Sequence, residues 1–553
     1  MATLPVLPKD RQLRPTETLR RGVSFVLGWV RADVDGATGY RLGVMGATLL
    51  TFGLGFLLWD RFPLREDEAI YAYWARHFAH VDPWFLTVWP DKPPLFLWSL
   101  AGAFELFGAS PAAARFVNMA ATGLTVPVVA AIARRLWGPS AGLLAGITFA
   151  LNPFVLSFAP TAFTDPLLVL WGMLALYAAL ARRPLWTGIA LGAAIMTKQQ
   201  GLLFVPLVVA AVLHGQGMMA NGPRPTHHAI RPTLLGLALV ILPIILWDSQ
   251  RWAVAPSPWD LAGRNYGGLS LLPVDQWWPR WRSWSDLLWY VGGSWAAWLG
   301  LLAMAWGKAK GNIGGSTRSR ILSPASRLPS PTPLLLLWTA GFLAFHLFTT
   351  VQPWDRYLLP LAPMMALLVG WMGAGWSRHT GMILGLAWLL ILLPPGLNAA
   401  RGGVPLGGDH GDYAGLDRAF AWVQTHAPAD AVLYHQELGW QHQFYLFGQT
   451  QQTQQTQKTN GGGFDLRWTP SAVYLADNAA KTPHRQKFLI QPAWAATQDQ
   501  PRFLPMRGVA WVPRFQADNV TVYEIVTPPG QPCDWCVCAP SPAHSAPDWA
   551  VIP

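Results

Sequence analysis

REDEAIYAYWARHFAHVDPWFLTVWPDKPP, residues 65–94, gathers five acidic residues, a lysine and several aromatic residues between long apolar runs. Charged side chains beside a bilayer cost free energy unless they are paired or hydrated, so such a cluster indicates a functional site. The alternative is an ordinary solvated loop that follows a membrane span. On either interpretation, the flanking apolar runs make this stretch part of a membrane protein.

The composition of the whole chain supports the same assignment. Of its 553 residues, 52% are hydrophobic and only 12% are charged, and the mean hydropathy is +0.25. Soluble domains carry roughly a quarter charged residues. The net charge of +11 lies mostly in short loops between apolar runs, where it acts as a topology signal, so no nucleic-acid partner is expected.

The basic residues orient the chain relative to the bilayer. Residues 1–41 form a basic tail that we expect to be cytoplasmic, and a first span at 43–59 leads to the acidic stretch on the outer face. The segment 95–107 is too short for a crossing, which needs about 20 residues, so we interpret it as an interfacial or re-entrant helix. The other expected membrane segments are 112–133, 139–158, 166–181, a pair of short helices at 185–213, 232–247, 286–306, 333–350, 357–375 and 380–397. The prediction is a polytopic α-helical protein of the inner or plasma membrane with about eleven to thirteen spans.

The pattern changes after residue 397. Apolar runs shorten there, and strands are expected at 431–435, 487–490, 508–512 and 520–526, with helices at 413–427 and 470–479. The predicted parts are therefore a tail at 1–41, a transmembrane domain at 42–397 with an outer loop at 60–94, and a soluble extracytoplasmic α/β domain at 398–553 with an irregular Pro-rich end. The three cysteines, Cys533, Cys536 and Cys538, do not form a disulfide framework, and their role stays open.

An ordered set of motifs between about residues 43 and 380 resembles one family. Residues 67–72, Asp-Glu-Ala-Ile-Tyr-Ala, are similar to the DE-x-x-YA motif that follows the first span of GT-C glycosyltransferases. The closer branch is the group of protein O-mannosyltransferases and lipid A aminoarabinose transferases. Further similarities lie at 91–95 (K-P-P-L), 107–115 (FG…AAR), 135–138 (RLFG), 164–166 (the second outer-loop aspartate), 197–198 (TKG) and 356–360 (RYLLP). Gln199 and Gln200 depart from the family, which usually has Gly-Pro at that bend.

The resemblance implies a glycosyltransferase that moves a sugar from a polyprenyl-phosphate donor to an acceptor hydroxyl or amine on the outer face, by a single inverting displacement. Such a reaction needs a carboxylate to accept the acceptor's proton and cations to hold the departing phosphate. Asp67 is the predicted base, Glu68 or Asp165 orients the acceptor or the sugar, and Lys92 and Arg356 bind the phosphate. The residues expected to line the substrate site are Tyr71, Lys198 and Tyr357.

The expected partners are the lipid-phosphate sugar, a lipid, glycan or protein acceptor, and membrane lipids. No cofactor is expected. A divalent metal can stabilise a departing phosphate, but the group that the chain resembles is generally regarded as not strictly metal-dependent. In the predicted topology the six charged candidates, Asp67, Glu68, Lys92, Asp165, Lys198 and Arg356, all reach the same outer face.

Each candidate also has a structural interpretation. Asp67 and Asp165 are good helix-starting residues, and Lys92 and Lys198 can be interfacial anchors. Arg356 can pair with its neighbouring aspartate. Two other classes of function remain open at this point, a lipid or sugar transporter or flippase and a non-catalytic membrane scaffold, although no internal repeat of the kind common in transporters is present.

Overall fold

The structure is a computed structural model that describes residues 37–217, 227–265, 270–294, 297, 299–300, 332–374, 378–450, 463–496 and 500–527. Several sequence predictions fall outside these residues. They concern the tail up to residue 36, the last part of the expected span 286–306, the short basic loop that follows it up to residue 331, the three cysteines and the Pro-rich end.

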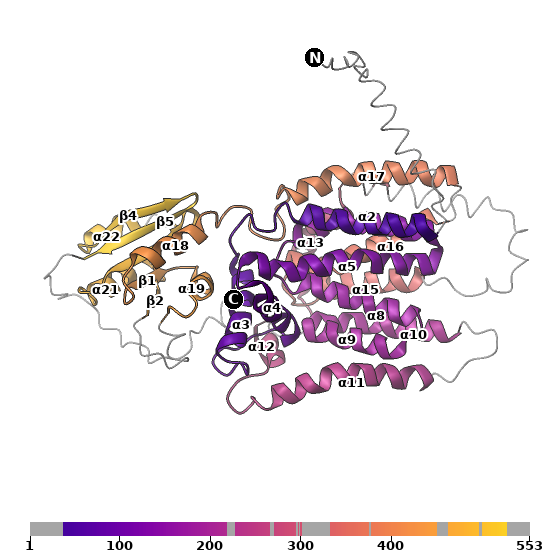
Figure 1. Cartoon of the computed structure of the whole chain (residues 1–553), viewed down its shortest axis with the longest axis horizontal. Coiled ribbons are helices and arrows are strands. Elements are labelled where there is room, and N and C mark those ends of the chain that lie inside the picture. The colour runs from indigo at the N-terminus through magenta and orange to yellow at the C-terminus, as the bar shows by residue number, and fades with distance from the viewer. Residues whose placement is uncertain are drawn as a thin grey trace, which may run out of the picture.

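Most of the described chain is a bundle of apolar helices that run side by side along one axis (Figure 1). In the described part, four helical segments are long and apolar enough to cross a membrane, and six more are apolar but only 10–17 residues long. Only 17% of the apolar window of the 229–249 helix is buried within the protein, as expected for a face in contact with lipid. The chain is therefore a polytopic membrane protein. The helices of the bundle are α2 (Ala37–Gly55), α5 (Pro111–Trp137), α6 (Pro139–Ala150), α7 (Pro153–Phe158), α8 (Asp165–Leu180), α9 (Pro184–Thr197), η1 (Gln199–Phe204), α10 (Val205–Gly217), α11 (His227–Ser249), α13 (Trp277–Gly292), α15 (Thr332–Phe348), α16 (Leu361–Gly373) and α17 (Arg378–Ala400).

Proline and capping residues set the helix boundaries. Ser110 caps α5, because its Oγ accepts the Ala113 N–H at 3.1 Å, and Pro111 occupies the first turn. The predicted span 139–158 is not one continuous helix, since the structure divides it into α6 and α7. At the break, Asn152 Oδ1 accepts the Phe154 N–H at 2.9 Å, and Pro153 starts the new helix.

Small residues allow neighbouring helices to approach closely. A Cβ atom at Gly188 of α9 would lie 1.9 Å from the Thr233 carbonyl oxygen of α11, and one at Gly236 of α11 would lie 2.1 Å from the Leu185 oxygen. Close backbone contact of this kind is typical of helix pairs in membranes, where burial of apolar surface does not drive association.

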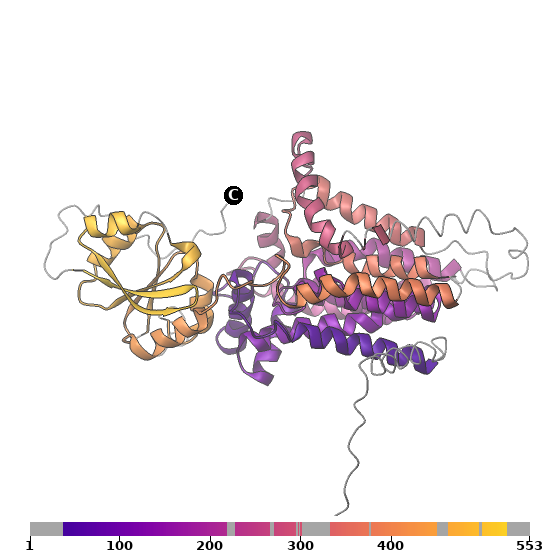
Figure 2. The ribbon, with the colours of Figure 1, turned by 90° about the horizontal axis from the view of Figure 1, so that it is seen from above.

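A second layer lies across one end of the bundle. It contains α3 (Glu66–His80), α4 (Pro94–Phe107) and α12 (Pro258–Asn265). The short helices η2 (Val274–Gln276) and η5 (Asp355–Leu358) directly precede α13 and α16. Figures 1 and 2 both show α3 and α4 between the bundle and the C-terminal domain. α3 and the loop that follows it carry three of the six charged candidates, Asp67, Glu68 and Lys92.

The C-terminal domain is a mixed five-stranded sheet with helices, in the order β2-β1-β3-β5-β4. The two β1 pairings are parallel, whereas β3–β5 and β4–β5 are antiparallel. All four predicted strands and both predicted helices are present, but β2 was not predicted, because its sequence DLRW is short and polar. The elements are α18 (Leu416–His426), β1 (Val432–His435), α19 (Gly439–Tyr445), β2 (Asp465–Trp468), α21 (Ala472–Ala480), β3 (Lys487–Pro492), η6 (Ala493–Ala495), α22 (Gln500–Met506), β4 (Ala510–Ala517) and β5 (Val520–Val526).

The C-terminal domain rests directly on α3. Arg76 Nη1 of α3 donates to the Phe444 carbonyl oxygen at 2.9 Å, and the Leu64 N–H donates to the Tyr445 hydroxyl at 3.2 Å. The Tyr73 ring lies 5.8 Å from the Trp440 ring. The domain therefore lies at the same end of the bundle as the acidic stretch.

Candidate active site

Three acidic residues form the first turn of α3, where the helix dipole favours negative charge. They are Glu66, Asp67 and Glu68. Arg65 occupies the N-cap, and its backbone N–H donates to Glu68 Oε2 at 3.1 Å. Asp67 is the second residue of the helix and not its cap. The helix-capping interpretation of Asp67 is therefore wrong, and its carboxylate is available for another role.

The Asp67 carboxylate pairs with a residue almost 300 positions away. Arg356 Nη2, from η5, lies 2.6 Å from Asp67 Oδ2. The Arg356 side chain is 11% exposed and that of Asp67 is 34% exposed, so solvent reaches the Asp67 carboxylate. Asp355, the expected alternative partner of Arg356, instead accepts the backbone N–H groups of Arg356 and Gly407.

Behind this pair lies a second, fully enclosed pair. Lys198 Nζ lies 2.6 Å from Asp165 Oδ1, and neither side chain is more than 4% exposed. Arg356 Nε is 4.0 Å from Asp165 Oδ2, and Lys198 Nζ lies 4.0 Å from the centre of the Tyr357 ring. Asp67, Arg356, Asp165 and Lys198 thus form one continuous charged network that extends from solvent into the bundle.

Lys92 lies beside this network, in the loop between α3 and α4. Its Nζ contacts Asp91 Oδ2 at 2.6 Å, and the side chain is 4% exposed. Burial opposes the lysine charge, but Asp91 and the nearby Tyr71 and Tyr357 raise its pKa above the ordinary value, so Lys92 is a cation at neutral pH. Gln199 Nε2 donates to the Asp91 carbonyl oxygen at 2.8 Å and so ties this loop to the bend that carries Lys198.

Tyr71 lies in the same enclosed region. Burial is the main cause that raises the pKa of its hydroxyl, and the Lys92 charge opposes this effect. Its ring packs edge-on against Phe96 of α4, with 5.9 Å between the ring centres. Tyr71 and Tyr357 therefore both lie beside the cations, and their role in lining a substrate site stays a prediction.

Glu68 has different surroundings, although it follows Asp67 in the sequence. It is fully buried, and Arg115 of α5 donates from Nε to Oε1 at 3.0 Å and from Nη2 to Oε2 at 2.9 Å. The backbone N–H groups of Ala162 and Arg65 occupy the same two oxygens. With every direction filled, Glu68 joins α3 to α5, and the geometry favours a structural role over contact with a substrate.

The structure brings Asp67, Lys92, Asp165, Lys198 and Arg356 close together, whereas Glu68, at the same end of the bundle, pairs separately with Arg115. That this end is the outer face stays a prediction. Sequence reasoning missed Arg115 as the partner of Glu68, Asp91 as the partner of Lys92, and Gln199 as the link between two loops. Only Asp91 had a local signal, since it directly precedes Lys92.

The charges of the network balance. With Lys92 and Asp91 counted in, the site contains three ion pairs, each of one cation and one carboxylate, so its net charge is zero. The pairs are Lys92–Asp91, Lys198–Asp165 and Arg356–Asp67. Among the described residues, no group of three or more His, Cys, Asp and Glu side chains is arranged to hold a metal ion. An incoming phosphate would therefore meet protein cations that are already paired with carboxylates.

The described chain is a polytopic membrane protein with a charged network at one end of its helix bundle, and it is similar in sequence and fold to the following proteins. Residues 91–247 match the family model described as dolichyl-phosphate-mannose-protein mannosyltransferase, a range that contains Lys92, Asp165 and Lys198. A curated relative from Pseudomonas aeruginosa, the undecaprenyl phosphate-alpha-4-amino-4-deoxy-L-arabinose arabinosyl transferase, is 26% identical over 357 residues. That match covers 58% of this chain and 58% of the relative.

Solved structures show the same fold over most of the chain. ArnT from Cupriavidus metallidurans bound to undecaprenyl phosphate is 15% identical and has a TM-score of 0.58, with 88% of this chain and 98% of that chain covered. The apo state of the same protein also has a TM-score of 0.58, at 16% identity. The GT-C resemblance that the motifs indicated is confirmed.

Proposed function

We propose that this chain is an integral-membrane glycosyltransferase that moves a sugar from a polyprenyl-phosphate donor to an acceptor hydroxyl or amine. The observation that carries the proposal is the ion pair between Asp67 and Arg356, which is partly open to solvent and backed by buried charges. The similarity to an arabinosyl transferase and to a mannosyltransferase family model supports it.

In the proposed reaction Asp67 is the general base. The acceptor oxygen or nitrogen forms a bond to the anomeric carbon while its proton passes to the Asp67 carboxylate. The bond between the anomeric carbon and the phosphate oxygen breaks, and its electron pair stays on that oxygen. The products are the glycosylated acceptor and a polyprenyl phosphate monoester.

Arg356 and Lys92 hold the phosphate. The Arg356 guanidinium can engage two phosphate oxygens at once, while Lys92 acts as a point charge. Because Arg356 is paired with Asp67 in this structure, the donor phosphate must compete with that carboxylate for the guanidinium. Donor binding would thereby release Asp67 at the moment when a base is needed.

The buried residues of the network position these groups. Asp165 contacts both Arg356 and Lys198 and is fully buried, so we propose that it orients the two cations and does not contact the acceptor. Tyr71 and Tyr357 form the wall beside Lys92 and Lys198. Glu68 keeps α3 in place through Arg115.

We further propose that no metal cofactor is required, because the side-chain cations supply the charge that a leaving phosphate needs. The donor and acceptor would meet at the outer face of an inner or plasma membrane, with the C-terminal domain extracytoplasmic. The acceptor class is a lipid, a glycan or a protein.

The test uses the purified full chain in liposomes with a polyprenyl-phosphate sugar that carries a label in the sugar. We expect the label to move to an added acceptor with release of polyprenyl phosphate, both with and without a chelator. Asp67→Asn should lower turnover at least about a hundredfold, since an amide cannot accept the proton. Donor that crosses the bilayer with its sugar–phosphate bond intact would favour a transporter and contradict the proposal.

A further inference from the structure

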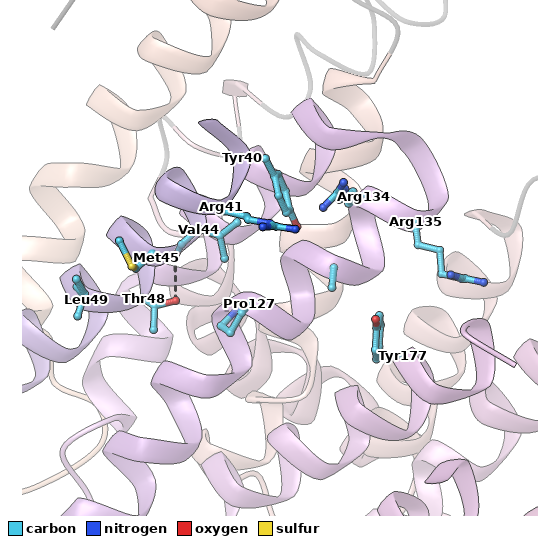
Figure 3. A pocket seen from close by; sticks show the side chains of 11 residues that line it. Tyr40, Arg41, Val44, Met45, Thr48, Leu49, Pro127, Arg134, Arg135 and Tyr177 are labelled. Carbon is cyan, nitrogen blue, oxygen red and sulfur yellow. Dashed lines mark hydrogen bonds between the residues drawn. The ribbon is translucent and has the colours of Figure 1, made fainter. Parts of the chain in front are cut away.

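A cavity lined by α2, α5 and α8 lies at the opposite end of the bundle from the charged network. It has a volume of about 630 Å³ and is lined by six residues of α2 between Tyr40 and Leu49, four of α5 between Pro127 and Arg135, and Tyr177 of α8 (Figure 3). Tyr177 follows Asp165 by twelve residues along α8, a rise of about 18 Å. The cavity is therefore a separate site.

One end of this cavity carries concentrated positive charge. Arg41, Arg134 and Arg135 are all exposed, and no carboxylate lines the cavity or pairs with these arginines among the described residues. Arg134 stacks over the Tyr40 ring at 4.4 Å, and Arg135 Nε donates to the Leu180 carbonyl oxygen at 2.7 Å. Figure 3 shows Arg41 and Arg134 directed toward the same end of the Tyr40 ring. These arginines keep several N–H donors for an anion.

The other wall is apolar and continues onto the outside of the bundle. Val44, Met45 and Leu49 lie along one side of α2, and the Met45 and Leu49 side chains are 53% and 62% exposed. On a helix of a membrane protein, exposed side chains of this type contact lipid chains. The cavity thus combines an anion site with an apolar wall that continues toward the lipid.

We infer that this cavity binds an anionic glycerophospholipid, with the phosphate between Arg41 and Arg134 and one acyl chain along α2. Basic pockets between membrane helices commonly bind anionic lipid headgroups. A free phosphate ion has no acyl chain and would leave the apolar wall of the cavity unoccupied. A zwitterionic lipid carries a cation in its headgroup, and the arginines would repel that cation. In the topology proposed above, this lipid belongs to the cytoplasmic leaflet.

The inference does not depend on sugar transfer, so its test measures binding. Phosphatidylglycerol and phosphatidylcholine are each added to the purified full chain in neutral detergent, and retained lipid is counted by native mass spectrometry. Removing two arginine charges in Arg41→Gln/Arg134→Gln should weaken phosphatidylglycerol binding about thirtyfold, since each basic residue contributes about a fivefold factor. The matched control is Arg183→Gln, an exposed arginine at the same end of the bundle that does not line the cavity.

A second variant tests the cavity without changing charge. Ala131→Phe places a large side chain in the cavity and should lower phosphatidylglycerol retention while Arg183→Gln retains it fully. Three results would overturn the inference: equal retention by all variants, equal retention of phosphatidylcholine, or complete displacement of the lipid by inorganic phosphate alone.

Discussion

At the residue scale, two adjacent carboxylates of one helix turn have different roles because of their partners. Asp67 faces Arg356 and solvent, whereas Glu68 faces Arg115 inside the protein. The sequence predicted that both belong to the site, since they stand together in the DE-x-x-YA motif. It could not predict their separation, because Arg115 is 47 residues away and only the tertiary structure brings it to Glu68.

The role of Glu68 predicts a loss of stability in Glu68→Gln. The amide cannot accept both Arg115 contacts and the two backbone N–H groups, and a buried ion pair that loses one partner costs roughly 3–5 kcal/mol. Thermal unfolding of the purified variant should occur well below that of the wild type. The control is Glu105→Gln on α4, whose side chain is 59% exposed and whose loss should be close to neutral. Equal unfolding temperatures for both variants would contradict the structural role.

The proposed binding of the donor phosphate by Arg356 and Lys92 predicts an effect on donor kinetics. Arg356→Ala and Lys92→Ala should lower kcat/KM for the donor by a factor that corresponds to about 2–4 kcal/mol, while the KM for the acceptor changes little. Arg356→Lys should restore only part of the activity, because the planar guanidinium is lost. Arg264→Ala removes an exposed ion pair on α12 and is the matched control. Donor kinetics that match this control would reduce both residues to membrane anchors.

At the element scale, the site depends on connections between loops that are far apart in the sequence. Gln199 stands where the family usually has Gly-Pro, and its side chain reaches the Asp91 and Pro258 carbonyl oxygens at 2.8 and 3.3 Å. The element boundaries were easier to predict, since strands with regular apolar patterns such as 520–526 are found as expected. The break at Asn152 was missed, because the apolar run continues through it and only the cap and Pro153 mark it.

The connection made by Gln199 predicts a moderate defect in Gln199→Ala. Loss of two side-chain hydrogen bonds should cost about 1–2 kcal/mol in the positioning of Lys92, and so raise the donor KM about fivefold to thirtyfold with a smaller change in kcat. The matched control is Gln424→Ala, which removes a similar bond to the Tyr445 carbonyl oxygen in the C-terminal domain. A donor KM equal to that of the control would show that the link does not position the loop.

At the scale of the whole molecule, the charged network lies at the end of the bundle that faces the C-terminal domain, and the arginine-lined cavity lies at the other end. The order of apolar and basic segments allowed the membrane class and the convergence of the site to be predicted. The contacts of the C-terminal domain with α3 were not predicted, since they join residues more than 350 positions apart, such as Arg76 and Phe444.

The proposed topology predicts different labelling at the two ends. In a chain whose three cysteines are replaced by serine, Ala429→Cys in the C-terminal domain should react with an impermeant thiol reagent applied to intact cells. Ser140→Cys, at the start of α6, should react only after permeabilisation. Both positions are exposed in the structure. The reverse pattern would place the charged network on the cytoplasmic face and overturn the proposed orientation.

Direct transfer of the sugar at the Asp67–Arg356 site is tested most directly by the stereochemistry of the product. In the charged network Asp165 is fully buried, and Asp67 is its most exposed carboxylate, so one base and no second nucleophile is expected to act. A single displacement inverts the anomeric centre, whereas a covalent intermediate retains it. The measurement is the anomeric configuration of the product formed by the purified chain from a donor of known configuration, determined by NMR. We predict inversion, and retention of configuration would contradict the proposed single displacement.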